Sequence, residues 1–456
     1  MTNLRAVTAF SRFGLGARIG DLASMADPLD AVLAEIDDAS TALAQNNELP
    51  DSATLYAMVR QGQTERRRQR QAGQQSSEMD AAEMDQALSP LQLMQTETRQ
   101  KLRAARQARI GFAERLVAFW TNHFAVEAGA NQLVRGLAGS FEREAIRPHI
   151  FGRFADMALA ATQHPAMLIY LNNAVSFGPQ SRLGERRARG LNENHARELM
   201  ELHTLGVDGG YTQADVTAFA NVLTGWSIGT QPRQGERYGR FTFRREAHEP
   251  GPQTVLGKIY DQDGVAQGKA VLADFVASPA TAQHIATKFA RHFVADMPDP
   301  ALVDRLVDNF IQSGGDLKAL ATCLVTDQVA WSAPASKIRT PQEFIWSAVR
   351  ALDLTLPPRQ VLRLLADLGQ PLWDPPSPEG FKDDVATWLA PDAMTNRLDA
   401  ADLMAARAKG PDDPREFAEA ILGDALSPAT ATAIERAESR AQGLALMLMS
   451  PEFQRR

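Results

Sequence analysis

The sequence predicts an all-α protein, a large multi-helix domain that carries one small β-hairpin insertion. Apolar residues recur at helical spacing through most of the 456 residues. The hydrophobic fraction of 44% and the charged fraction of 23% are those of an ordinary globular chain. Only the stretch 231–260 has the short runs and turn residues of strands. No fixed-period repeat is visible, which argues against a solenoid.

The first half of the chain is expected to be helical except for its turns. Pro165 suits the first turn of a helix, Thr212 suits an N-cap, and Gly225 suits a helix end. A long amphipathic pattern ends in FAERLVAFWTNHFAV, where His123 lies among aromatic residues. The expected helices are 8–13, 28–44, 91–126, 141–146, 151–162, 165–173, 191–206 and 212–224.

The second half begins with the expected hairpin and then returns to helices. RFTFR (240–244) and TVLGKIY (254–260) are expected to pair with each other across a segment that contains HEPGP. The proline-rich segment 372–380 is expected to be a rigid loop. The expected helices are 265–277, 280–294, 301–312, 317–325, 341–352, 358–368 and several within 384–449.

Nothing in the sequence marks a clean cut between domains, so we expect a single domain over 1–456. The alternative is two lobes, 1–230 and 261–456, joined by the hairpin insertion 231–260. The polar stretch 61–85 has few large apolar residues to offset the entropy of ordering it. We expect this arm to be mobile or at most a solvated helix, and its deletion to leave the melting temperature nearly unchanged.

Composition excludes several classes of site and partner. A formal net charge of −7 gives no global attraction to nucleic acid or to an anionic membrane, and we expect neither as a partner. Cys323 is the single cysteine, which excludes an internal disulfide and a multi-cysteine metal site. No stretch approaches ~18 apolar residues and no signal-peptide core is visible, so a cytoplasmic location is expected.

One predicted helix concentrates polar chemistry. The segment LNENHARELMELHTLG (191–206) holds three acids, two histidines, an arginine and two asparagines, yet it is apolar over most of its circumference. Such a helix is normally buried, so Glu198 and Glu201 are expected to point inward. A buried carboxylate needs a compensating group. The expected ones are Arg197, the amides of Asn192 or Asn194, a histidine or a metal.

Six motifs occur in a fixed order: FWTNHF, HPAMLIYLNN, NENHARELMELHTLGVDGGYTQADV, LTGW, HEPGPQTVLG and SPEF. In that combination the chain resembles the bacterial domain-of-unknown-function 1800 (DUF1800) family, from RFGLGAR to Phe453. The resemblance implies no particular reaction. Many relatives resemble exported proteins with a leader, which this chain does not show. The chain has His195 where relatives usually have an aromatic residue, and Gln253 where many have lysine.

The first class of function left open is a metal-dependent or acid/base enzyme, including a hydrolytic one. Its catalytic residues would be Glu198, Glu201, His123 and His164, in a pocket where the 191–206 helix meets the ends of two others. The same four are the candidate metal ligands, because carboxylates and imidazoles bind iron, manganese or zinc in helical bundles. A divalent or transition metal is the one cofactor that the sequence suggests.

Asn192, Asn194 and Arg197 are the candidates for binding a cofactor. The second class of function is a non-catalytic helical scaffold that binds a partner protein, or an anionic ligand through the arginine-rich loop 182–189. In that case His123 and His164 would donate hydrogen bonds to backbone carbonyls at helix ends. The sequence leaves both classes open.

Overall fold

The structure is a computed structural model that describes residues 2–42, 49–72, 89–187 and 190–456. Helices make up nearly all of the regular structure in these residues, and the strands are four pieces of three residues each. The predicted all-α class with a small β insertion is therefore confirmed. Buried apolar side chains from Ala9, directly after α1 (Thr2–Thr8), to Phe453 of α26 (Pro451–Gln454) form one contiguous core.

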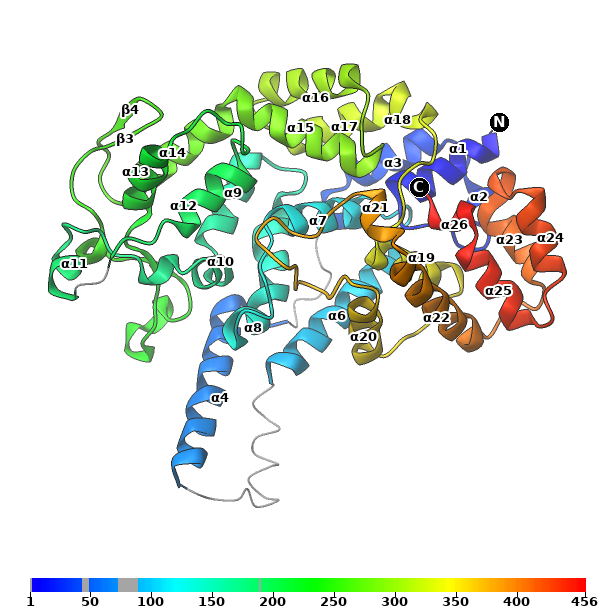
Figure 1. Cartoon of the computed structure of the whole chain (residues 1–456), viewed down its shortest axis with the longest axis horizontal. Helices are drawn as coiled ribbons and strands as arrows, with labels where there is room; N and C mark the ends of the chain where they lie inside the picture. The colour runs from blue at the N-terminus through cyan, green and yellow to red at the C-terminus, as the bar shows by residue number, and fades with distance from the viewer. Residues whose placement is uncertain (1, 43–48, 73–88, 188–189) are drawn as a thin grey trace.

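The helices lie in an elongated array with the two chain ends at the same end of the molecule (Figure 1). The remaining α-helices of the first half are α2 (Asp21–Ser24), α3 (Pro28–Asp37), α4 (Ser52–Ala72), α6 (Pro90–Gln107), α7 (Phe112–His123), α8 (Gln132–Phe141), α9 (Phe154–Gln163), α10 (Pro165–Tyr170), α11 (Arg182–Arg187), α12 (Asn194–Glu198) and α13 (Gln213–Leu223). Those of the second half are α14 (Val265–Ala277), α15 (Pro279–Phe293), α16 (Pro300–Gln312), α17 (Leu317–Thr326), α18 (Gln328–Ser332), α19 (Pro341–Ala351), α20 (Pro358–Asp367), α21 (Val385–Trp388), α22 (Pro391–Arg407), α23 (Pro414–Leu422), α24 (Pro428–Glu435) and α25 (Arg440–Met449).

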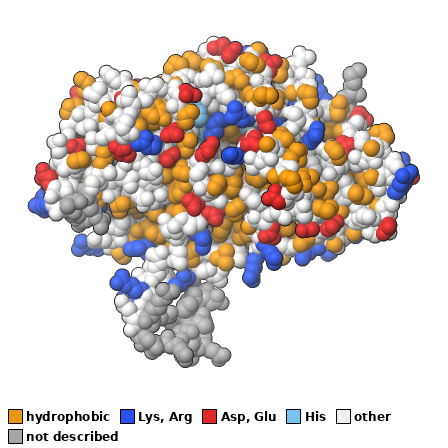
Figure 2. Space-filling view, in the orientation of Figure 1, with side chains coloured by type: hydrophobic (Ala, Val, Ile, Leu, Met, Phe, Trp, Pro, Cys, Tyr) orange, Lys and Arg blue, Asp and Glu red, His pale blue; other side chains and the backbone are white. Residues whose placement is uncertain are grey.

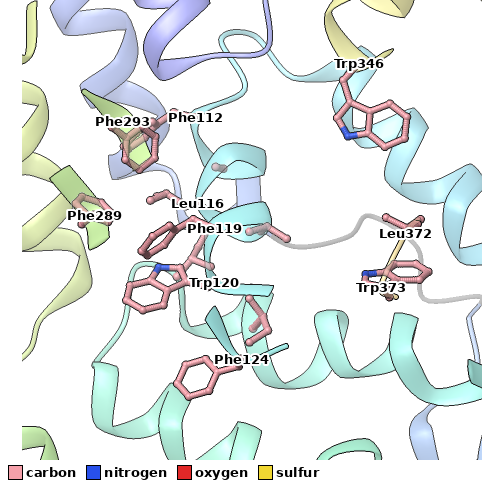
Figure 3. Close-up of a cluster of buried hydrophobic side chains, with 14 of the residues drawn as sticks. Phe112, Leu116, Phe119, Trp120, Phe124, Phe289, Phe293, Trp346, Leu372 and Trp373 are labelled. Carbon is pink, nitrogen blue, oxygen red and sulfur yellow. The ribbon is translucent and has the colours of Figure 1, made fainter. Parts of the chain in front are cut away.

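Helix α7 lies in the core and packs against α15. Its aromatic side chains Phe112, Phe119 and Trp120 lie beside Phe289 and Phe293 of α15 (Figure 3). The ring centroids of Phe119 and Phe289 are 5.4 Å apart in an edge-to-face arrangement, a favourable geometry for aromatic pairs. Aromatic contacts therefore hold α7 and α15 together.

The first turn of α7 is capped by a carboxylate from another helix. Gly111 precedes the helix with a φ of 98°, and no side chain of its own segment caps it. Instead, the buried Glu35 of α3 accepts hydrogen bonds from the backbone N–H groups of Ile110, Gly111 and Phe112 at 2.6–3.2 Å. A carboxylate at a helix N-terminus accepts hydrogen bonds from the unpaired N–H groups there and interacts favourably with the positive end of the helix dipole.

Three of the four strands lie within the expected stretch 231–260 and one lies just before it, and the strands pair differently from the expectation. β1 (Trp226–Ile228) pairs antiparallel with β2 (Phe241–Phe243), and β3 (Gln253–Val255) pairs with β4 (Lys258–Tyr260). The expected pairing of RFTFR with TVLGKIY is wrong. Leu256 and Gly257 have φ of 51° and 74°, the left-handed pair of a tight hairpin turn, so TVLGKIY folds back on itself.

The polar arm is only partly described. Residues 61–72 are the last three turns of α4, which extends away from the body (Figure 1). Residues 73–85 lie outside the described residues, so the predicted mobility of the arm stays a prediction. Among the helices that the structure describes, none has both the length and the apolar character needed to cross a membrane.

Candidate functional site

A cavity of about 180 Å³ lies between α7, α15 and the loop 370–383. Its polar lining includes Asn122 and His123 of α7, Lys288, Arg291 and His292 of α15, and Glu379, Lys382 and Asp383 of the loop. Figure 2 shows Lys and Arg side chains gathered beside a histidine on this face, over the region where α7, α15 and α21 meet in Figure 1.

Three polar residues form one stripe along α15. His284, Lys288 and His292 are four residues apart, so they lie on the same face of the helix. His284 Nε2 donates a hydrogen bond to the backbone carbonyl of Leu202 at 2.9 Å. Lys288 lies between the two histidines and lines the cavity.

A matching stripe of α7 faces this one, with the two helices antiparallel. Arg115, Phe119 and His123 are also four residues apart. Arg115 Nη2 is 3.3 Å from His292 Nε2, and the His123 and His284 rings are 6.1 Å apart. The ring of Phe119 lies 5.2 Å from that of His292. At the middle of the contact between α7 and α15, α7 therefore presents the aromatic ring of Phe119.

Lys288 has an ammonium group without a paired acid in the described part of the chain. Burial lowers its pKa to about 8, and the positive charge of Arg291 acts in the same direction. The negative charges of Glu379 and Asp383 oppose this shift without reversing it. At pH 7 about a tenth of such a lysine is the neutral amine, a far larger fraction than in a free lysine.

His292 is held in place at both ring nitrogens. Its Nδ1–H donates to Asp383 Oδ2 at 2.5 Å, and its Nε2 accepts from Arg115. Burial lowers the pKa of His292 to about 4, so the ring is neutral at pH 7. Burial alone would raise the pKa of Asp383, but His292, Arg456 and Lys337 hold it well below its usual range.

Two buried acids fix the walls of the cavity. Glu343 forms ion pairs with Arg115 at 3.2 Å and Arg456 at 2.8 Å. These arginines outweigh the effect of burial and lower the pKa of Glu343 to about 2. Glu142 pairs with Lys101 at 2.6 Å and Arg147 at 2.9 Å. The four cationic partners of these acids are therefore all engaged in buried ion pairs.

The loop that covers the cavity is tied to α7 by one asparagine. Asn122 Nδ2 donates to the carbonyl of Phe381 at 2.9 Å, and its Oδ1 accepts from the N–H of Phe381 at 2.8 Å. Gly380 has a φ of 88°, and a Cβ at this position would lie 2.4 Å from the backbone oxygen of Asn122. Only glycine allows this close approach.

Of the four predicted catalytic residues, one lines this cavity. His123 is buried, and its Nε2–H donates to the carbonyl of His203 at 3.1 Å. His164 is directed elsewhere: its Nδ1 accepts from the N–H of Ala166 and so caps α10, and its Nε2 is 3.4 Å from Glu144. Its acidic neighbour is therefore Glu144 rather than an acid of the 191–206 segment.

Glu198 and Glu201 are half-buried, whereas we expected both to point inward. Burial raises the pKa of Glu198, and the charge of Glu201 adds to this effect. The reason for the difference is a π-helical turn at Leu199–His203, which follows α12. Residues Leu199, Met200 and His203 of this turn fill the core, and Glu201 is left at its edge.

Two of the three candidate cofactor-binding residues, Asn192 and Arg197, have structural partners for their side chains. Asn192 Oδ1 accepts from the N–H of Asn194 at 2.9 Å, which shapes the start of α12. Arg197 pairs with Glu193 at 3.1 Å and donates to Gln213 at 2.8 Å. Of the arginine-rich loop 182–189, residues Arg182–Arg187 form α11, and 188–189 lie outside the described residues.

Within 2–42, 49–72, 89–187 and 190–456, no three His, Cys, Asp or Glu side chains are grouped so that they could hold a metal ion. The grouping expected for His123, His164, Glu198 and Glu201 as metal ligands therefore has no support among the described residues. Their contacts explain this: His123 donates a hydrogen bond to a backbone carbonyl, and His164 Nε2 lies 3.4 Å from Glu144.

Sequence reasoning missed the α15 stripe. The signal was present in HIATKFARHF (284–293), where histidine, lysine and histidine recur at intervals of four. A lysine on the buried face of a helix is unusual enough to mark a candidate site. The sequence favours the 191–206 segment instead because polar residues are more closely spaced there.

Comparison with known proteins gives one match. No curated protein matches the chain, and no solved structure does. A family described as a protein of unknown function, DUF1800, matches residues 8–455, nearly the whole chain. The matched region includes α7, α15 and the loop 370–383, and thus the entire cavity. This chain belongs to the DUF1800 family.

Proposed function

We propose that this protein is an acid/base enzyme whose site is the cavity between α7, α15 and the loop 370–383. Lys288 is the residue that exchanges a proton with the substrate. The observation that carries the proposal is that this ammonium lines a cavity without a paired acid among the described residues, and that burial lowers its pKa to about 8. A lysine tuned toward neutral pH is suited to act as a general base.

The charge at the cavity rim favours an anionic substrate. Arg291 and Lys382 are exposed side chains that line the cavity, and Glu379 is the exposed acid beside them. The deeper acids Glu142 and Glu343 already have cationic partners. A volume of about 180 Å³ suits a small molecule as the substrate.

The surrounding residues position the lysine rather than compete with it. His292 is neutral and bonded at both ring nitrogens, so it fixes the end of α15 without supplying a counter-charge. Phe119, which lines the same cavity as Lys288 and packs against Phe289, supplies an apolar wall. An apolar wall keeps the charged form of a lysine unfavourable and preserves a reactive amine.

The proposal differs in place from the enzyme expected on the 191–206 helix, and shares His123 with it. The alternative, a scaffold that binds a partner protein or an anionic ligand through the loop 182–189, predicts no chemistry in this cavity. The two are separated by substituting Lys288 while Arg291 and Lys382 are kept.

The test is hydrogen exchange into small carboxylic acids that have an acidic C–H bond. The wild-type protein is incubated in D2O with each acid, and deuterium incorporation is followed by NMR. We expect incorporation above the buffer rate for at least one acid, and its loss in Lys288→Met. Lys269→Met, at an exposed lysine of α14, is the matched control and should leave the rate unchanged. Equal rates for wild type and Lys288→Met would overturn the proposal.

A further inference from the structure

We propose that Lys288 forms a covalent imine with the carbonyl carbon of a small α-keto acid. This inference rests on the proposed function only for placing the substrate in the same cavity. It goes further in naming the bond that forms and the class of substrate.

Lys288 has no anionic partner among the described residues that would prevent it from acting as a nucleophile. The charge of Lys288 acts on the imidazoles of His123, His203 and His284, whose own pKa values are lowered by burial and by this charge. These rings are neutral near pH 7 and cannot hold an ammonium by charge. A lysine needs this lack of a counter-ion to attack a carbonyl as the neutral amine.

The charged groups that act on Lys288 are Asp383, Glu379 and Arg291, and none of them forms an ion pair with it. Asp383 is committed to His292 and Lys337, at 2.5 Å and 3.0 Å. Glu379 is exposed at the rim. Arg291, the neighbouring cation on α15, further disfavours a second positive charge. No described carboxylate therefore holds Lys288 in its protonated form by an ion pair.

The residues of the cavity also indicate the class of substrate. A carbonyl carbon must reach the amine, and the cations Arg291 and Lys382, which line the same cavity, suit a carboxylate on the same molecule. An α-keto acid places these two groups on adjacent carbons. A small one fits the cavity volume of about 180 Å³.

The step balances without an oxidant or reductant. The nitrogen lone pair of Lys288 forms a C–N bond to the carbonyl carbon, and one amine proton moves to the carbonyl oxygen to give a carbinolamine. The C–O bond then breaks, and the hydroxyl leaves as water with one proton from solvent. The product is a protonated imine, which withdraws electrons from the adjacent carbon and makes its C–H bond more acidic.

The experiment is reductive trapping of the full-length protein with pyruvate and cyanoborohydride, followed by peptide mass mapping. We expect an N-carboxyethyl group on Lys288 and little on the exposed Lys269. Acetone is the matched neutral ketone. Trapping with pyruvate should exceed trapping with acetone by about tenfold, since one charge-assisted hydrogen bond contributes roughly that factor.

Two variants test the imine bond and the carboxylate contact separately. Lys288→Arg retains the positive charge but cannot form an imine, so it should abolish trapping without loss of folding. Lys382→Gln should reduce the advantage of pyruvate over acetone. Modification spread evenly over exposed lysines, with none favoured at Lys288, would overturn the imine. If deuterium exchange still depended on Lys288, the proposed general base would stand without the imine.

Discussion

The imidazole of His195 gives the sharpest stability prediction, because the ring is fully buried and neither nitrogen has a partner among the described residues. Burial lowers its pKa from 6.5 to about 3. The unfolded chain therefore binds a proton as the pH falls below 6.5, while the folded protein does not. Stability is lost over the window from 6.5 down to about 3. Between pH 7.5 and pH 5 the loss from this one group is about 2 kcal/mol.

The variant His195→Phe removes the titrating group and keeps a ring of similar shape. We expect the stability difference between pH 7.5 and pH 5 to shrink by about 2 kcal/mol relative to wild type. Denaturant unfolding at the two pH values measures this difference. His195→Gln is the matched control: it does not titrate either, but it keeps an unsatisfied polar group and should be less stable than His195→Phe at pH 7.5. An unchanged pH dependence in both variants would refute the reasoning.

Three further predictions follow from the walls of the cavity and the cap of α7. Glu343→Gln leaves its two buried arginine partners uncompensated, and thermal unfolding should show a loss of about 3 kcal/mol. Glu35→Ala removes the acceptor of three backbone N–H groups and should cost about 2 kcal/mol in the same assay. Gly380→Ala should lower the melting temperature more than Gly251→Ala, since both have φ near 88° but only Gly380 lacks room for a Cβ; equal effects would contradict the proposed contact with Asn122.

The helical fold could be predicted because its signals are local. Apolar spacing and N-terminal prolines set most helix positions: Pro28, Pro165, Pro341 and Pro358 each begin a helix in the structure. The strand pairing could not be predicted in the same way. It depends on left-handed backbone at Leu256, a residue type that rarely adopts it.

The candidate site could be predicted only in part, because it is assembled from distant segments. His123 was identified from its place at the end of a helix, and it does line the cavity. Lys288 and Asp383 are separated from it by more than 150 residues of sequence, and their contacts depend on tertiary packing. The half-buried position of Glu201 depends on a π-helical turn, which a spacing of 3.6 residues per turn does not reveal.

The central claim is that Lys288 is an unusually reactive amine, and the most direct test is its titration. Competitive acetylation with trace acetic anhydride over a range of pH, mapped by peptide mass spectrometry, reports the pKa of each lysine. We expect Lys288 to titrate with a midpoint near the value of about 8 that burial gives it. A midpoint near ~10.4, the ordinary value for a lysine, would contradict the account.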